Sequence, residues 1–203
     1  MDCTVGLGGH SSSLLKIIEK DGLLIGLDLD QTALNECEKN LRNNTHQDNF
    51  TLYHTNYRDA VTLLKQLGIK KIDHVVLDLG FSSFQMDNPD RGFSFRLEGN
   101  LDMRLDPEAK INAEQFLNHA SAEEIKEILM KYGEISPKDS TKIADAILLQ
   151  KKNHQLKTTF DLKNAIHKKD LYPLVFQAIR IHINQELNSL HQFLEDIFNY
   201  LDP

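Results

Sequence analysis

The sequence predicts an α/β fold followed by a region made of helices. Short apolar runs typical of buried strands occur at 23–28, 50–54 and 73–79, and segments with helical periodicity separate them. A glycine-rich loop leads from the end of an earlier strand into the first helix. From residue 107 to 203 the apolar residues recur at helical spacing and no strand pattern is present. We therefore expect an open sheet with an inserted or appended helical domain.

Composition excludes several classes of protein. Of the 203 residues, 40% are hydrophobic and 26% are charged, and no apolar run approaches the ~18 residues of a membrane helix. The first residues, M-D-C-T-V-G, do not resemble a secretory signal. Cys3 and Cys37 form neither a metal-binding pattern nor a C-x-x-C pair. We expect a cytoplasmic protein with reduced thiols, no membrane segment and no metal ion.

Charge is distributed unevenly along the chain. The net charge is −7, but residues 138–182 hold nine Lys or Arg against four Asp. That segment is therefore +5, which leaves −12 for the rest. A solvated helical face and a surface that binds phosphates are both consistent with this segment.

The glycine loop at the start of the chain predicts a nucleotide-like cofactor. Gly6, Gly8 and Gly9 would let the backbone approach a ligand closely before a helix over Ser11–Glu19. A dinucleotide fingerprint would require glycine where this chain has Ser11. The loop alone does not identify the cofactor.

An acid ends the second predicted strand, 23–28. Asp28 lies 20 residues after Gly8, where a carboxylate can accept hydrogen bonds from the ribose hydroxyls of an adenosine-containing cofactor. Asp30 is expected to cap a helix over Thr32–Leu41. Tyr57 follows the strand Phe50–His54, and its ring could stack on adenine or belong to the core.

The helical region begins after Asp106. Ser121 and Glu124 form a capping box. The predicted helices are Asn112–His119, Ala122–Lys131, Lys138–Lys151, Thr159–His167, Tyr172–Asn188 and Ser189–Leu201.

The stretch from Asp78 to Asp106 is the strongest indication of a functional site. It follows the predicted strand 73–79 and combines structure-breaking residues with many charges of both signs, which is typical of a functional loop at the carboxyl end of a strand. Four aromatic residues provide apolar anchors that a disordered segment lacks: Phe81, Phe84, Phe93 and Phe95. The alternative is an ordered surface loop held by internal salt bridges.

Three strings in this stretch, D-L-G-F-S-S-F-Q-M-D, R-G-F-S-F and L-D-M-R, resemble the MraW/RsmH family. Its members are S-adenosylmethionine-dependent methyltransferases that act on the exocyclic amine of a cytosine in the 16S ribosomal RNA of the bacterial small subunit. The resemblance extends over D-C-T-V-G-L-G-G-H, I-G-L-D-L-D, Y-G-E and F-Q-A-I-R-I-H-I-N-Q-E-L.

The resemblance implies a class I methyltransferase (Rossmann-like) sheet with an inserted all-helical domain. The core would comprise residues 1–87 with 183–203, and the helical domain, residues 88–182, would recognise RNA. Compared with the family, the chain starts late and stops early, so we expect an incomplete sheet in which Met1–Thr4 is a stub between the second and fourth strands. A fragment, a misassigned start and a decayed gene are all compatible with this.

The resemblance also implies site residues. Asp78, with the backbone carbonyls of Leu79 and Gly80, would orient the target amine, and Ser82 and Ser83 would position the base. Phe81 or Phe84 would stack on an extruded cytosine. The residues expected to bind S-adenosylmethionine are Gly8, Gly9, His10, Asp28, Tyr57, Asp78 and Gln85.

Two other functions remain open from the sequence. A non-catalytic remnant of the family would bind the cofactor or RNA without transferring a methyl group. An NAD-dependent oxidoreductase is less consistent with Ser11 and with the absence of a substrate domain that carries a catalytic His and Arg pair. The expected partner is small-subunit ribosomal RNA or the ribosomal particle.

Overall fold

A computed structural model describes residues 1–18, 21–45, 48–153 and 156–202. The chain forms two units. One consists of Met1–Ser82 with Leu187–Pro203, and the other of Ser83–Glu186. The sequence predicts two boundaries near these positions, but between residues 87 and 88 and between residues 182 and 183.

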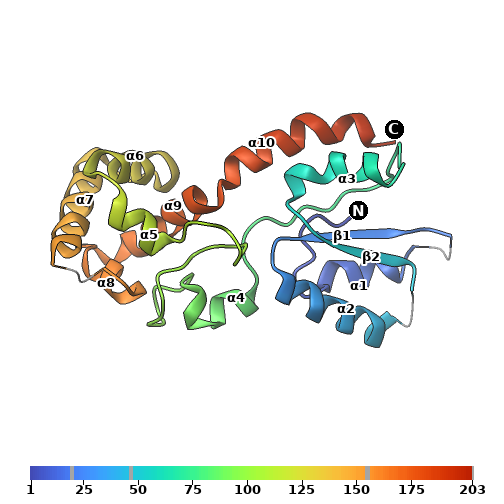
Figure 1. Ribbon diagram of the computed structural model, residues 1–203, viewed down its shortest axis with the longest axis horizontal. Helices are drawn as coiled ribbons and strands as arrows, with labels where there is room; N and C mark the ends of the chain where they lie inside the picture. Colours follow the sequence, from blue (N-terminus) through green and yellow to red (C-terminus); the bar gives the residue numbers. More distant parts are fainter. Residues whose placement is uncertain (19–20, 46–47, 154–155, 203) are drawn as a thin grey trace. The chain divides into compact units, whose positions relative to one another are not determined.

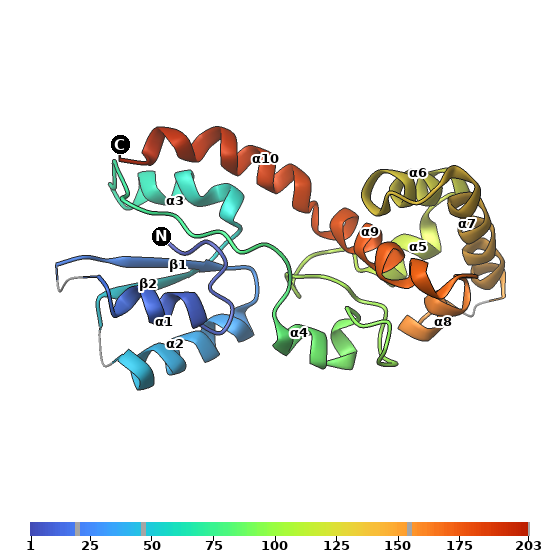
Figure 2. The same cartoon turned by 180° about the vertical axis from the view of Figure 1, so that it is seen from behind.

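The first unit has a parallel sheet with helices on both faces. In Figures 1 and 2, α1 (Gly9–Leu15) and α2 (Gln31–Thr45) cover one face, and α3 (Ala60–Gln66) and α10 (Glu186–Ile197) cover the other. Strands β1 (Leu24–Asp28) and β2 (Phe50–His54) pair in parallel from Leu24–Phe50 to Asp28–His54. This confirms the mixed α/β class and the predicted strand 50–54.

The side chains of β1 point alternately to the two faces of the sheet, and each face has its own hydrophobic core. Ile25 and Leu27 pack with Phe193 and Ile197 of α10, whereas Leu24 packs with the residues of α1 and α2. Gly26 also faces the second side, where a Cβ would lie 2.7 Å from Val5 and 2.5 Å from Leu52. Only glycine permits this close approach.

The stub before β1 lies where the sequence places it. Asp2 pairs in parallel with both Gly26 and Val76. The predicted fourth strand, 73–79, is wrong as a regular strand: the segment holds a single isolated bridge, at Val76, and a second bridge lies just before it, at Ile72. A ladder needs consecutive paired residues, and the stub pairs with Val76 through Asp2 alone.

Helix ends in this unit follow local capping. The side chain of Asp30 accepts hydrogen bonds from the backbone N–H groups of Thr32 (3.0 Å) and Ala33 (3.4 Å), which confirms Asp30 as a cap. Helix α2 extends to Thr45, beyond the predicted Leu41. Helix α1 ends at Leu15, so the prediction that this helix continues through residue 18 is wrong. The last residue of the predicted helix, Glu19, lies outside the described residues.

The second unit consists of helices joined by loops, and in the residues that the structure describes its one β-bridge joins Asn100 to Thr158. Its core is formed by buried apolar residues of α6 (Ala122–Gly133), α7 (Pro137–Lys152) and α9 (Tyr172–Asn184), among them Leu129, Ile143 and Ile179. The capping box of Ser121 and Glu124 is confirmed. The elements are α4 (Ser83–Asp87), η2 (Pro89–Arg91), α5 (Ala113–His119), α6 (Ala122–Gly133), α7 (Pro137–Lys152), α8 (Thr159–Asn164), η3 (Lys169–Leu171) and α9 (Tyr172–Asn184).

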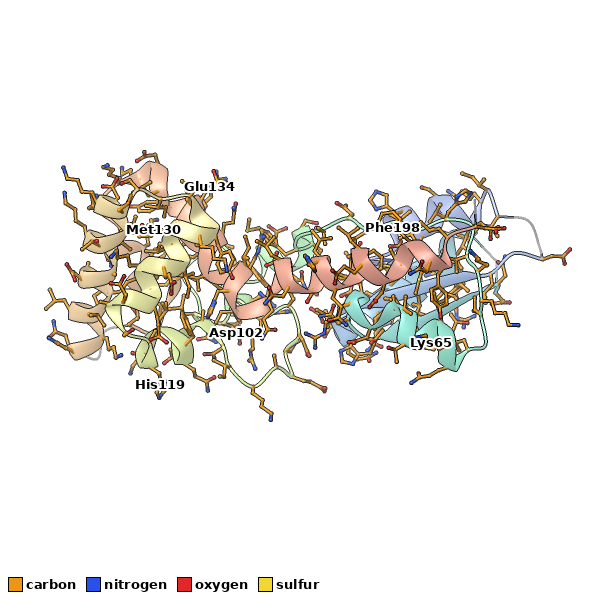
Figure 3. The ribbon with its side chains drawn as sticks, turned by 90° about the horizontal axis from the view of Figure 1, so that it is seen from above. Lys65, Asp102, His119, Met130, Glu134 and Phe198 are labelled. Carbon is orange, nitrogen blue, oxygen red and sulfur yellow. The ribbon has the colours of Figure 1, made fainter. Side chains whose placement is uncertain are left out.

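The loop between η2 and α5 is tied to α9 inside this unit. The Asn184 side chain donates to the carbonyl of Met103 (2.8 Å) and accepts from the N–H of Leu105 (2.7 Å). Arg104 forms an ion pair at 2.6 Å with Asp102. Asp102 is labelled in Figure 3. The residues of the string L-D-M-R therefore help to hold this loop in place. Internal salt bridges are the feature that the sequence predicts for an ordered surface loop, the alternative to an active-site loop.

The predicted long helix 172–188 is interrupted, so that prediction is wrong. Gln185 has a φ of 50° and ends α9, and α10 starts at Glu186 rather than at Ser189. Arg180 and Glu186 form an ion pair at 2.8 Å across the turn. The apolar periodicity continues on both sides of Gln185, and therefore it does not reveal the break.

Candidate cofactor-binding and active site

The glycine loop combines a closely packed glycine with two open ones. Gly8 has a φ of 92°, and a Cβ there would lie 3.0 Å from Cys37 Sγ and 3.3 Å from Leu41 of α2. At Gly6 and Gly9 a Cβ would meet nothing within 4 Å. Gly8 therefore holds the loop against α2, while the backbone at Gly6 and Gly9 borders open space into which a ligand can come close.

Asp28, at the carboxyl end of β1, connects the strand to this loop. Its Oδ2 accepts a hydrogen bond from the N–H of Gly6 (2.8 Å), and its Oδ1 accepts one from the N–H of Asp30 (2.9 Å). Burial raises the pKa of this carboxyl above its usual value, and the hydrogen bonds from Asp30 and Gly6 oppose that shift. Each oxygen keeps further acceptor capacity beside the open glycines.

Sequence reasoning missed a buried pair beneath the loop. Ser11 Oγ donates to Asp2 Oδ2 at 2.6 Å, and both residues are completely buried. This hydrogen bond joins the strand stub to the first turn of α1, the helix that begins at Gly9. A polar residue on the inner side of the first helix, nine positions after an acid in a strand, is the signal that could have indicated the pair.

Two predicted cofactor residues face each other across the loop. His10 Nδ1 lies 3.9 Å from Asp78 Oδ2, and their side chains are 60% and 69% exposed. The backbone N–H of Asp78 donates to Thr4 Oγ1 at 2.8 Å, so the stub fixes the start of the functional stretch. The structure thus brings Gly8, Gly9, His10 and Asp78 into one neighbourhood at the carboxyl edge of the sheet.

Tyr57 belongs to the core. It is 9% exposed, and its ring packs edge-to-face on Phe193 with centroids 5.6 Å apart at 88°. It begins η1 (Tyr57–Asp59) directly after β2, where the side chain of Asn56 caps the turn. Of the two roles that the sequence leaves open, core packing is therefore observed, and stacking of the ring on the adenine of a cofactor stays a prediction.

The remaining predicted site residues are divided between the units. Ser82 ends the first unit and is half-buried. Ser83 and Gln85 belong to α4 of the second unit, where Ser83 is exposed and Gln85 is buried at 6% exposure. Phe84, on the same helix, is exposed at 38%. The stretch 78–106 is thus not one loop, because most of it is built into the helical unit.

The described part of the chain lacks two other kinds of feature, a membrane-spanning helix and a metal-binding cluster. No helix there is long and apolar enough to cross a membrane. Residues 1–18, 21–45, 48–153 and 156–202 contain no cluster of three or more His, Cys, Asp or Glu side chains able to hold a metal ion.

These features define a class of protein. It is an α/β protein with a parallel sheet covered on both faces and a glycine loop beside an acid at the carboxyl end of a strand, where such sheets bind their ligands. The sequence profile of the MraW methylase family matches residues 1–203, the whole chain. The chain belongs to this family.

Curated relatives agree with this assignment. The chain is 40% identical over 205 residues to the ribosomal RNA small subunit methyltransferase H of Thermotoga neapolitana, covering 96% of the chain and 66% of the relative. The proteins of the same name from Halothermothrix orenii and Ureaplasma parvum serovar 3 are 37% and 39% identical, and the match covers 100% of the chain with 67% and 68% of theirs. The chain thus spans about two thirds of the length of these relatives.

Proposed function

We propose that this chain is an S-adenosylmethionine-dependent methyltransferase that acts on the exocyclic amine of a cytosine in small-subunit (16S) ribosomal RNA. The observation that carries the proposal is the hydrogen bond of 2.8 Å between the N–H of Gly6 and the carboxylate of Asp28, which assembles the glycine loop and the acid into one site. Family membership and the names of the relatives support the reaction and the substrate. The cytoplasm, where ribosomes assemble, is the corresponding location.

The residues of the first unit fit S-adenosylmethionine. Asp28 would accept hydrogen bonds from the ribose hydroxyls, and the open backbone at Gly6 and Gly9 would allow the ligand to lie against the loop. His10 and Asp78 offer exposed polar groups beside that loop. When bound, the cofactor supplies a methyl group on a positively charged sulfur.

Asp78 is the best candidate for orienting the target amine. The exocyclic amine of cytosine is a weak nucleophile because its lone pair is delocalised into the ring. A carboxylate oxygen that accepts one amine N–H fixes the direction in which the nitrogen presents that lone pair. Asp78 suits this role because its side chain is exposed while its backbone is held by Thr4. Leu79 and Gly80, both exposed, would add carbonyl acceptors.

A strong general base is not required by this chemistry. The amine becomes acidic once it is methylated, so its proton can leave to solvent or to the Asp78 carboxylate. The family resemblance is the reason for including Ser82, Ser83 and Gln85 in the proposed site. In the same proposal the helical unit recognises RNA, since it contains the positively charged segment 138–182.

Two measurements test the proposal. Calorimetry should show binding of S-adenosylmethionine and none of NAD. Incubation with a labelled methyl donor and small-subunit particles should yield a cytidine methylated on its amine, identified after digestion of the RNA to nucleosides. Cofactor binding without transfer would indicate the non-catalytic alternative, and binding of NAD instead would exclude the methyltransferase assignment.

A further inference from the structure

The helical unit carries a row of two cations and three aromatic rings. The guanidinium of Arg96 lies 5.6 Å from the centre of the Phe95 ring, and that ring lies 6.1 Å from the ring of Tyr172. Lys163 Nζ lies 5.5 Å from the Tyr172 ring and 4.6 Å from the Phe160 ring. We call these five residues the cation–aromatic row.

Folding assembles this row from three separate segments. Phe95 and Arg96 come from the loop after η2, Phe160 and Lys163 from α8, and Tyr172 from the start of α9. Phe95 is also anchored from below, because its ring packs on buried Phe176 at 5.9 Å and 71°. The row therefore has a rigid base.

The row is accessible to a ligand. Phe95, Phe160 and Tyr172 are each half-buried, Lys163 is half-buried and Arg96 is exposed. Neither Arg96 nor Lys163 makes an ion pair with a carboxylate in the part of the chain that the structure describes. Both charges are thus available to an anion that approaches the rings.

Nearby charges favour an anionic partner. Lys157 and Lys169 are exposed on either side of α8. Asp161, which lies between the two row residues of α8, accepts hydrogen bonds from the backbone N–H groups of Lys157 (3.0 Å) and Thr158 (2.7 Å) as part of a capping box. Its carboxylate is therefore committed to the helix end. Two further acids lie close to row residues in the sequence: Glu98, which follows Arg96, and Asp170, which precedes Tyr172; both are exposed.

We propose that the cation–aromatic row binds single-stranded RNA, with bases stacked on Phe95, Phe160 and Tyr172 and phosphates paired with Arg96 and Lys163. Proteins bind single strands by this combination, because every base has a face that can stack and every nucleotide carries a charge. A row that served only to hold α8 against α9 would need neither half-exposed rings nor cations without carboxylate partners. The proposal rests on the proposed function, since it takes RNA as the substrate.

The test uses the whole chain and two RNA oligonucleotides of equal length, one with bases and one abasic. Phe160→Leu should weaken binding of the base-containing RNA about tenfold, the order expected for one lost stacking contact, and leave abasic RNA unaffected. Phe160→Tyr, which keeps a ring, should bind like the unmodified chain. Lys163→Gln should reduce the slope of log affinity against log salt by ~0.7, and Lys163→Arg should not.

A matched control lies elsewhere on the same unit. Lys131 lies 5.1 Å from the ring of Tyr132 on α6, and in Figure 1 α6 lies at the top of the helical unit, with α8 well below it. Lys131→Gln should leave both the affinity and the salt slope unchanged. Thermal unfolding of every variant reveals any loss of folding.

The outcomes separate this inference from the proposed function. If folded Phe160→Leu discriminates between the two RNAs like the unmodified chain, and Lys163→Gln keeps the full salt slope, the row does not bind RNA. The proposed function still stands in that case if the unmodified chain methylates small-subunit RNA. If the unmodified chain binds neither oligonucleotide nor small-subunit RNA, both fail.

Discussion

The hydroxyl of Ser11 donates a hydrogen bond of 2.6 Å to the carboxylate of Asp2, and both residues are fully buried. Asp2 is also the residue that pairs with Gly26 on one side and Val76 on the other. The same residue thus holds the strand stub in the sheet and anchors α1, which begins at Gly9. Ser11 occupies the position where a dinucleotide-binding loop would have glycine, and here its side chain supports the loop from below.

Replacing Ser11 with Ala should lower the free energy of unfolding by about 1–3 kcal/mol, because the buried Asp2 carboxylate would lose a hydrogen-bond donor. Urea unfolding measures the change. Ser13→Ala is the matched control: Ser13 is exposed, and its hydroxyl makes a longer bond of 3.3 Å to the carbonyl of Gly9. Equal stabilities of the two variants would contradict a supporting role for Ser11.

Asp28→Ala should weaken binding of S-adenosylmethionine by about 1.5–3 kcal/mol, the value of a lost charge-assisted hydrogen bond. The substitution also removes the acceptor for the N–H of Gly6, so the loop itself should loosen. Calorimetry gives the affinity. Asp21→Ala, an exposed acid before β1, should bind the cofactor normally, and undiminished binding by Asp28→Ala would exclude Asp28 as the ribose contact.

How far the sequence predicts the site depends on the distance over which residues interact. The glycine loop, the acid at the end of β1 and the cap at Asp30 are local patterns, and each has the predicted place in the chain. The bond between Asp2 and Ser11 and the packing of Tyr57 on Phe193 depend on how distant segments meet. A single sequence without tertiary information does not contain those contacts.

For the fold, too, some features can be predicted from the sequence and others cannot. Apolar periodicity predicts strand 50–54 and most helices, because burial on one face determines both. It does not predict the break at Gln185, where the backbone adopts a positive φ without glycine, or the interruption of the strand pattern at 73–79. These features follow from a local turn and from the number of paired neighbours, which hydrophobicity does not encode.

Stability of the helical unit should decrease at low pH through Asp139. Hydrogen bonding from Lys168 lowers the pKa of this carboxyl from 3.8 to about 2. Because the folded state favours the charged form, the stabilisation is present above pH 3.8 and is lost as pH falls towards 2. In thermal unfolding, Asp139→Asn should be less stable than the unmodified chain at pH 7, and the difference should shrink below pH 3.8.

Asp145→Asn, on the exposed side of the same helix α7, serves as the control for that experiment and should unfold like the unmodified chain at each pH. A difference between Asp139→Asn and the unmodified chain that stays constant down to pH 2 would show that the ion pair with Lys168 does not contribute the stabilisation.

Reversal of the exposed lysines Lys152, Lys157 and Lys169 to Glu should weaken RNA binding and flatten its salt dependence without changing cofactor affinity. Lys151 and Lys168 are unsuitable for this test, although they lie in the same positive segment. Lys151 donates to the carbonyl of Ala120 at 3.1 Å, and Lys168 pairs with Asp139 at 2.9 Å.

The control for the charge reversal changes three exposed lysines of the first unit, Lys16, Lys65 and Lys70, to Glu. It alters the net charge of the chain by the same amount. If both triple variants lose RNA affinity equally, the effect comes from total charge, and the positive segment 138–182 is a solvated surface rather than a binding site.

Thr4→Val should lower the rate of methyl transfer. The substitution preserves the shape of the side chain but removes the hydroxyl that accepts a hydrogen bond of 2.8 Å from the backbone N–H of Asp78. Without this bond the start of the functional stretch is held less firmly, since the segment 73–79 has no continuous ladder. A shift of ~1 Å in an orienting group can cost on the order of a hundredfold in rate.

The control for Thr4→Val is Thr4→Ser, which keeps the hydroxyl of Thr4 and lacks its methyl group. If Asp78 orients the amine, Thr4→Ser should recover most of the rate that Thr4→Val loses, and Asp78→Asn should be slow whichever residue stands at position 4. The two substitutions should then not be additive, because both act on the position or chemistry of one carboxylate. Fully additive effects in the Thr4→Val, Asp78→Asn double variant would mean that Thr4 affects the rate by another route, and that the contact at 2.8 Å only stabilises the sheet edge.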